Sequence, residues 1–393
     1  MKPLPISAFS IVTALGEDQA THASALRAGI SGLQARRFET ATLDAWLGVV
    51  DALDGVRLPA ELARFDCRNN RLAALALRSD GFDAHVRDAA ARHGAHRVGV
   101  MVGTSTSGIL QSEIAYRERA ADGALPAWLH YAETHDNASL ARYVQAALQL
   151  QGPAWVISTA CSSGAKAYAA AARLIALGVI DAAVVGGVDT LCMTTLYGFH
   201  SLELLSTEVC RPWDARRNGL SLGEGGSFAL LQRDDTAPAA WLLGCGESSD
   251  GHHMSSPHPE GAGAVDAMRA ALADASLQSN QVDYVNLHGT GTRNNDTAED
   301  AAVCQVFGHT VPVSSTKSLT GHALGAAGAI EAAIALLALR HGFVPPGTHC
   351  EQPDPTLHAR YQREASDARL AVTASNSFGF GGSNSCLLFG AAR

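Results

Sequence analysis

The cysteine at position 161 stands where a short apolar run meets a helix-forming segment. Trp155–Thr159 (WVIST) is rich in β-branched residues, and the Ala-rich stretch Ser163–Leu177 follows Cys161 almost at once. A thiol near a helix N-terminus faces free N–H groups and the positive end of the helix dipole, which lower its pKa and can hold a developing oxyanion. The position predicts a nucleophile, and the alternative is a small buried thiol packed at a strand–helix junction.

Two histidines further along the chain lie in Gly-rich surroundings. His288 ends the apolar run Val282–His288 and begins the sequence His-Gly-Thr-Gly-Thr, and His322 follows Lys317 by five residues. A histidine at the end of a strand, followed by flexible backbone, is well placed to point its ring into a cleft. A helix of small residues then carries Glu331. Taken separately, these residues also fit hydrogen-bonded structural histidines, a solvated lysine and an ordinary helix charge.

The Gly-rich segment Asn376–Asn384 (NSFGFGGSN) surrounds Phe380 with glycines. It resembles a dinucleotide-binding fingerprint only superficially, because it leads from one strand-like run directly into another and lacks the βαβ context. The glycines permit an unusual backbone path. We expect this path to leave an N–H group exposed beside the mobile ring of Phe380.

The His-rich segment Gly251–His258 (GHHMSSPH) is an alternative place for chemistry. Its three histidines could be taken for metal ligands, but their spacing matches no common zinc motif. The eight cysteines are scattered without a Cys-x-x-Cys pair, which argues against a thiolate zinc site and against a disulfide framework. We therefore predict no metal site and a reduced, cytoplasmic protein.

Short β-rich runs alternate with longer segments of helical composition. Because several runs are continuously apolar, the strands should be buried on both faces, as in layered α/β proteins. The predicted strands are Val98–Thr104, Trp155–Thr159, Ala182–Asp189, Ser227–Gln232, Val282–His288, Val311–Thr316, Leu370–Ala374 and Ser385–Gly390, and the predicted helices are Ser163–Leu177, Gly261–Ala275, Asp296–Phe307 and Gly325–His341. The polar stretch Asp234–Pro238 separates two series of elements, which divides the chain into halves at 1–236 and 237–393. Each half has a strand that enters a helix through a Gly/Ser/Thr-rich turn, which is suggestive of an internal duplication.

The composition excludes several classes of protein. The chain has 393 residues, of which 47% are hydrophobic and 17% charged, so it must bury much of its surface and cannot be disordered. The net charge of −9 argues against a nucleic-acid partner. The apolar stretch Ile330–Leu339 is far shorter than the ~20 residues that span a bilayer, and no signal peptide is recognised. We therefore expect no membrane partner.

Taken together, the four chemical segments resemble the β-ketoacyl-acyl carrier protein synthases, which are condensing enzymes of the thiolase-like superfamily. The order of Cys161, the motif at His288, Lys317 with His322, and Gly-Phe-Gly-Gly around Phe380 is specific to that family. The resemblance covers nearly the whole chain. It implies an α/β protein with a thiolase-like layered αβαβα fold of two similar halves, and it makes the His-rich segment a lining loop of the site.

The resemblance also implies the roles of the residues. Cys161 resembles the nucleophile that receives the acyl chain as a thioester, and the N–H groups of Cys161 and Phe380 would hold the tetrahedral oxyanion. His288 and His322 resemble the pair that binds the malonyl thioester and stabilises its enolate. Lys317 is similar to the lysine that orients this site. Phe380 also resembles the aromatic gate that admits the acyl chain.

The implied reaction is the decarboxylative Claisen condensation of malonyl-acyl carrier protein with a Cys-bound acyl chain, which gives a β-ketoacyl-acyl carrier protein. Glu331 would be the structural partner of the lysine. Thiolases carry a second cysteine where this chain has Phe380, and the initiating synthases carry an asparagine where it has His322, so the elongating class fits best. Two other functions remain open: a non-catalytic chain-length partner subunit, and a cysteine hydrolase.

The pathway and the partners follow from the same resemblance. Lys166 stands where fatty-acid enzymes more often carry a histidine, which leaves fatty acid, type II polyketide and aryl polyene synthesis open. We expect a homodimer first and a heterodimer with a chain-length-factor-like subunit second. No metal or redox cofactor is implied, because the pantetheine arm belongs to the carrier. The acidic carrier needs a basic rim, for which the candidates are Arg64, Arg68 and Arg71, or Arg211, Arg216 and Arg217.

Overall fold

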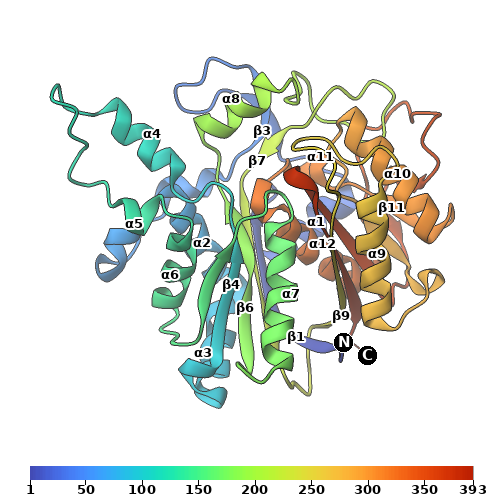
Figure 1. Ribbon diagram of the computed structural model, residues 1–393, viewed down its shortest axis with the longest axis horizontal. Helices are drawn as coiled ribbons and strands as arrows, with labels where there is room; N and C mark the ends of the chain where they lie inside the picture. Colours follow the sequence, from blue (N-terminus) through green and yellow to red (C-terminus); the bar gives the residue numbers. More distant parts are fainter. Residues whose placement is uncertain (393) are drawn as a thin grey trace.

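Two helices rich in small residues form the central layer of the molecule. The computed structural model describes residues 1–392 (Figure 1), and in it α7 (Ser163–Ala176) and α12 (Ala327–His341) pack against each other between two sheets. The approach is close: a Cβ on Gly164 would lie 2.9 Å from the backbone nitrogen of Ala329. A larger residue at Gly164 would therefore push the two helices apart.

The sheet of the first half lies on one side of these helices. Its strands run in the order β5-β4-β6-β8-β1, with parallel pairing among β5, β4 and β6 and antiparallel pairing of β8 with β6 and β1. The strands are β1 (Leu4–Thr13), β4 (Val98–Gly103), β5 (Ala154–Ile157), β6 (Ala182–Asp189) and β8 (Gly225–Gln232). Val184 faces one apolar cluster and Val185 another, as expected for strands that are buried on both faces.

The sheet of the second half repeats this arrangement. Its order is β11-β10-β15-β16-β9, again with three parallel and two antiparallel members. The strands are β9 (Ala240–Ser249), β10 (Tyr284–Asn286), β11 (Pro312–Ser314), β15 (Val372–Gly379) and β16 (Ser383–Ala391). The short β13 (Arg360–Tyr361) extends the edge, and β1 pairs with β9, so that hydrogen bonds join the two sheets into one of 11 strands. The repeated order supports an internal duplication.

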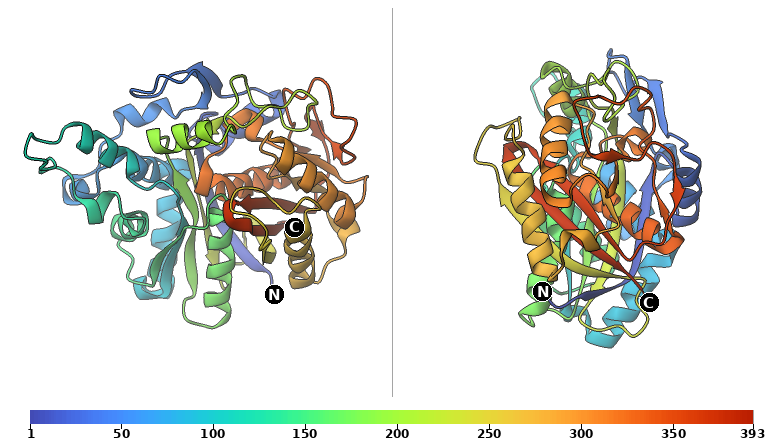
Figure 2. Two further views of the ribbon diagram at one scale, coloured as in Figure 1. Left: turned by 45° about the horizontal axis from the view of Figure 1, so that its top comes forward. Right: turned by 90° about the vertical axis from the view of Figure 1, so that its right-hand side faces the viewer.

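Helices cover the outer faces of both sheets (Figures 1 and 2). On the first sheet these are α2 (Arg68–Arg78), α3 (Phe82–His93) and α6 (Ala138–Ala147), and on the second they are α9 (Ala262–Ala275) and α10 (Arg293–Phe307). The layers therefore alternate α, β, α, β, α, as the resemblance implied. Each predicted strand and helix is present within a few residues. The predicted division after residue 236 falls in the loop that joins β8 to β9.

The central helix α12 is longer than the apolar stretch seen in the sequence. Together with the turn before it, Leu324–His341 has a mean hydropathy of 1.4 over 18 residues, which by length and composition alone would be enough to cross a membrane. However, 89% of this segment is buried inside the protein. Its apolar surface is therefore part of the core between the sheets.

Candidate active site

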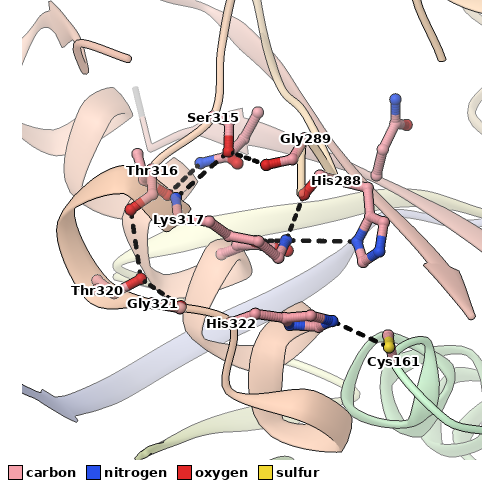
Figure 3. A network of polar contacts seen from close by, with 12 residues as sticks. Cys161, His288, Gly289, Ser315, Thr316, Lys317, Thr320, Gly321 and His322 are labelled. Atoms are coloured by element: carbon pink, nitrogen blue, oxygen red, sulfur yellow. Dashed lines mark hydrogen bonds and ion pairs between the residues drawn. The ribbon is translucent and has the colours of Figure 1, made fainter. Parts of the chain in front are cut away.

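Cys161 lies in a tight turn between β5 and α7. Ala160 has a left-handed backbone with φ of 53°, and α7 begins at Ser163, two residues after the cysteine. The Ser163 hydroxyl accepts a hydrogen bond from the Thr159 N–H at 2.8 Å, which fixes the turn. A non-glycine residue in this conformation is strained. The turn directs the Cys161 side chain towards the second half of the molecule, where it is buried (Figure 3).

His322 meets Cys161 from the other side. Its Nε2 lies 3.0 Å from the Cys161 Sγ (Figure 3), and its ring centroid is 5.4 Å from that of His288 at an interplanar angle of 85°. His322 lies between β11 and α12, whereas His288 follows β10. Two histidines from different loops therefore converge on one thiol.

Lys317 fixes the protonation pattern of His288. The Lys317 ammonium donates to the His288 backbone carbonyl and lies 3.3 Å from the Nδ1 of His288 (Figure 3). It also forms a buried ion pair with Glu331. Because an ammonium can only donate, Nδ1 must accept, and the ring hydrogen of neutral His288 is on Nε2. Burial and the nearby Lys317 charge lower the pKa of His288 well below its usual value, so the ring is neutral. His288 is therefore a hydrogen-bond donor through Nε2.

The sequence predicted that the helix terminus lowers the pKa of Cys161, whereas in the structure this pKa is raised. Burial raises the pKa of Cys161 to about 12, although the Lys317 charge and a hydrogen bond from the Phe380 N–H oppose this effect. Burial, followed by the Lys317 charge, likewise lowers the pKa of His322 well below its usual value. The prediction was wrong because it counted the helix terminus but not the loss of water around the sulfur. The neutral His322 ring is in position to accept the thiol proton.

Phe380 closes the site from the loop between β15 and β16. The Gly379 Cα is so close to the turn that a Cβ there would lie 2.7 Å from the Thr159 carbonyl oxygen. Gly381 has a φ of 78°, a conformation that favours glycine. The Phe380 ring lies 5.7 Å from that of Phe199, centroid to centroid. The glycines thus bring the Phe380 N–H to the sulfur and its ring to the side of the cavity.

A cavity of about 550 Å³ opens in front of these side chains. Cys161, His288, His322 and Phe380 line it, whereas Lys317 lies behind the histidines. The 250–258 segment contributes Asp250, Ser255, Ser256 and Pro257 to the wall, so it is a lining loop. The only candidate metal cluster in residues 1–392 is therefore a different one, Cys161 with His288 and His322, whose ligand atoms lie within 4.8 Å of one another.

That cluster does not fit a metal ion. A ligating histidine usually donates its second N–H to a carboxylate or carbonyl, which raises its basicity. Here a cation stands behind His288, and the nitrogen that faces the cavity carries the hydrogen instead of a free lone pair. The arrangement suits hydrogen-bond donation to an oxygen.

Two residues of the site were not identified from the sequence. Glu299 of α10 accepts hydrogen bonds from the N–H groups of His288 and Gly289 at 2.8 and 2.7 Å, and burial raises its pKa to about 7. It holds the loop that presents His288. Phe199 lies on α8 (Met193–Ser201) beside Phe380. A carboxylate in the helix-forming segment after the His288 motif was a usable signal for Glu299, whereas nothing in the sequence marked Phe199.

Most of the arginines predicted to form a basic rim are already paired. Arg217 is only 2% exposed and forms ion pairs with Asp354 and Asp296, so it cannot contact a carrier. The others with carboxylate partners are Arg68 with Glu224, Arg71 with Asp66, Arg211 with Glu208, and Arg216 with Asp214 and Glu351. Within residues 1–392, Arg64 is exposed and has no such partner. It is the remaining cation of the predicted set.

Comparisons with known proteins match most of the chain. Two family models cover consecutive parts of the chain: beta-ketoacyl synthase, N-terminal domain, at residues 60–237, and the C-terminal domain at residues 239–351. Nodulation protein E of Rhizobium leguminosarum bv. trifolii is 37% identical over 305 residues, which are 75% of this chain and 76% of that protein. The 3-oxoacyl-[acyl-carrier-protein] synthase 2 of Vibrio cholerae is 34% identical over 335 residues, 80% of this chain and 79% of that protein. The solved ketosynthase ApeO of Xenorhabdus doucetiae, in complex with its chain length factor ApeC, matches with a TM-score of 0.92 and 37% identity over 99% of this chain and 98% of that one.

The five alternating layers, with the thiol and both imidazoles at their centre, define a protein of the thiolase-like class. The chain belongs to the β-ketoacyl synthase family, and it is a β-ketoacyl-acyl carrier protein synthase.

Proposed function

We propose that the site carries out a decarboxylative Claisen condensation on carrier-bound substrates, with Cys161 as the nucleophile. The observation that carries the proposal is the contact between the Cys161 Sγ and the His322 Nε2, with the donor His288 beside it. A thiol can hold an acyl group, and two neutral imidazole donors can hold a thioester oxygen. The thiol and the two imidazoles line the same cavity.

The first step is transfer of the acyl chain to Cys161. The thiol gives up its proton to His322, its sulfur forms a bond to the acyl carbon, and the carrier thiolate leaves and takes up the proton. The oxyanion of the tetrahedral intermediate lies at the N–H groups of Cys161 and Phe380. The short distance of Gly379 from the cysteine turn supports this placement.

The second step is decarboxylation of the malonyl thioester. The bond to the carboxylate carbon breaks, carbon dioxide leaves, and the electron pair moves onto the thioester oxygen held by His288 and by His322, which for this step carries its ring hydrogen on Nε2 instead of Nδ1. The resulting enolate carbon attacks the acyl carbonyl on Cys161. Collapse of that intermediate expels the Cys161 thiolate, which takes up a proton from solvent, and releases the β-ketoacyl product on the carrier. Lys317 keeps His288 in the donor tautomer throughout.

The carrier-bound acyl chain comes from fatty acid synthesis or from a type II polyketide or aryl polyene pathway. Two similar proteins support synthesis of this general kind: a 3-oxoacyl-[acyl-carrier-protein] synthase 2, and a ketosynthase solved with its chain length factor. No resident cofactor is part of the proposal. We place the protein in the cytoplasm because all eight cysteines are unpaired.

A second thiolase-like subunit pairs with this chain along β5. This strand is the end of the sheet, and Trp155 on it is 40% exposed. An unpaired edge with an exposed aromatic ring favours addition of another chain. A homodimer and a heterodimer with a chain-length-factor-like subunit both fit this edge. The similar ketosynthase ApeO is in complex with a chain length factor, which favours the heterodimer.

The alternative functions fit the site less well. A non-catalytic chain-length subunit does not need a thiol that contacts a histidine, whereas Cys161 has this contact. A cysteine hydrolase needs an oriented Cys–His pair. Here the Nδ1 of His322 has no hydrogen-bond partner within residues 1–392, and the Nδ1 of His288 faces Lys317. Neither histidine therefore has the orienting acceptor that a hydrolase needs.

The test is condensation by the purified chain, alone and with a candidate chain-length subunit, on acyl and malonyl carriers. Mass spectrometry of the Cys161 peptide should show the acyl adduct, and a β-ketoacyl carrier should form. Cys161→Ala should reduce product by more than about a thousandfold, whereas Cys304→Ala, on α10, should not. Product at the normal rate from Cys161→Ala would disprove the assignment of the nucleophile.

A further inference from the structure

Helix α8 is a surface element that supports the gate from the side. Phe199, near its C-terminal end, contacts Phe380 with 5.7 Å between ring centroids, and both residues line the cavity. Leu196 is the only fully buried residue of this helix within the described chain. Met193 and Phe199 are only partly buried against the same apolar cluster, so polar contacts at the helix start also matter for the position of α8.

The first turn of α8 depends on a carboxylate from another helix. Cys192 at the N-cap position makes no capping hydrogen bond with its side chain, and the turn has no acidic residue of its own. Glu113 of α4 (Ile109–Arg117) takes that place: its Oε2 accepts the N–H of Met193 at 2.9 Å, and its Oε1 accepts the N–H and the hydroxyl of Thr194, both at 2.7 Å. A negative charge at this end of a helix also interacts favourably with the helix dipole.

The other tethers of α8 are weaker or lie outside it. The Tyr197 hydroxyl accepts the N–H of Thr42 at 3.2 Å on the exposed side, and the N–H of Leu191, before the helix, donates to the buried Glu224 at 3.2 Å. Neither contact holds the first helical turn. The Glu113 carboxylate is thus the contact that fixes the direction in which α8 extends towards Phe199.

We propose that Glu113 is a positioning residue for the gate. By fixing the first turn of α8, it keeps Phe199 against Phe380 and so limits the width of the passage that a long acyl chain takes to Cys161. The inference rests on the gate role given to Phe380 in the proposed function. It makes Glu113 a determinant of access for long chains, although its side chain does not line the cavity.

The test compares a short and a long thiol reagent at Cys161. Mass spectrometry of the Cys161 peptide gives the alkylation rates with N-ethylmaleimide and N-dodecylmaleimide. Glu113→Ala should raise the long-to-short ratio by roughly two- to thirtyfold, the range that corresponds to loss of a helix N-cap. Glu113→Gln should raise it less, because the amide oxygen keeps one acceptor. The matched control is Glu118→Gln, which removes a charge at the C-cap of α4, where the carboxylate accepts from the Trp128 Nε1 and does not contact α8.

An unchanged ratio in folded Glu113→Ala and Glu113→Gln would overturn the proposal, as would an equal change with both reagents or the same shift in Glu118→Gln. If Glu113→Ala does not fold, Glu113→Gln carries the test alone. Alkylation needs neither a carrier nor acyl transfer. Failure of the proposed function would instead appear as absence of acyl-Cys161 in the wild-type protein, whatever the alkylation ratio is.

Discussion

The two halves of the molecule share one strand order but place different chemistry on it. The turn after β5 carries Cys161, and the equivalent turn after β11 carries Lys317 and His322. The loop after β4, Thr104–Ser107, is equivalent to the loop after β10 that begins at His288. The first half therefore supplies the thiol, and the second supplies the donors that face it.

The two equivalent loops are also held by hydrogen bonds to different carboxylates. Asp189, at the end of β6, accepts hydrogen bonds from the N–H of Ser105 and from the N–H and hydroxyl of Thr106, at 2.8 to 2.9 Å. Glu299 holds the loop of the second half through the N–H groups of His288 and Gly289. Asp189 holds a loop that does not line the cavity, whereas Glu299 holds the loop that presents His288. A duplicated backbone can thus keep one loop structural while its counterpart acquires chemistry.

The largest expected effect distinguishes the roles of the two carboxylates, Asp189 and Glu299. Asp189→Asn and Glu299→Gln should each lower the free energy of unfolding by about 2–4 kcal/mol, because each leaves a buried donor without its acceptor. Only Glu299→Gln should also slow condensation, by about tenfold or more per folded molecule, because it releases the loop of His288. Denaturant titration gives the stabilities, and turnover per folded enzyme gives the rates. Equal losses of activity in the two variants would break the comparison.

A smaller effect concerns pH. Burial raises the pKa of Glu299 from its ordinary 4.5 to about 7, so between these values the folded protein holds a proton that the unfolded chain has released. The contribution of Glu299 to stability is therefore complete below pH 4.5 and decreases as the pH rises towards 7. Glu299→Gln removes this dependence, so its stability relative to the wild type should rise by roughly 2–3 kcal/mol between pH 4.5 and 7. Parallel curves of unfolding free energy against pH would contradict the assignment.

The smallest expected effect is at the strained turn of the first half. Ala160→Gly relieves a left-handed conformation but adds freedom to the unfolded chain, so we expect the free energy of unfolding to rise by only about 0.5 kcal/mol. The control, Ala172→Gly within α7, should lower it by about 1 kcal/mol. Chemical denaturation resolves the two. A loss of stability at Ala160 as large as at Ala172 would mean that the turn is not strained.

Much of the fold could be predicted because its signals are local. Continuous apolar strands and Ala-rich helices mark their own ends, so β6 occupies Ala182–Asp189 as predicted. The five predicted site residues also come together: four line the cavity, and Lys317 lies behind the histidines. Motif order located these residues without any knowledge of distances.

The errors concern properties that depend on residues far away in the sequence. Burial by the second half raises the pKa of Cys161, and carboxylates 79 and 137 positions further along the chain neutralise Arg217 (296 − 217 = 79 and 354 − 217 = 137). The support of α8 by Glu113 likewise joins residues that are 80 positions apart. Charge and reactivity at a site are set by the packing around it, which the sequence of one segment does not contain.

The central claim is that the acyl group is carried by Cys161 of the first half, whereas His288 of the second half is needed mainly to decarboxylate the malonyl group. Its most direct test measures both partial reactions in Cys161→Ala and His288→Ala, against the wild type. We predict that His288→Ala still forms acyl-Cys161 within about threefold of the wild-type rate but releases carbon dioxide from the malonyl carrier at least about a hundredfold more slowly, whereas Cys161→Ala forms no acyl-enzyme and still decarboxylates. Loss of both partial reactions to the same extent in both variants would contradict this division between the halves.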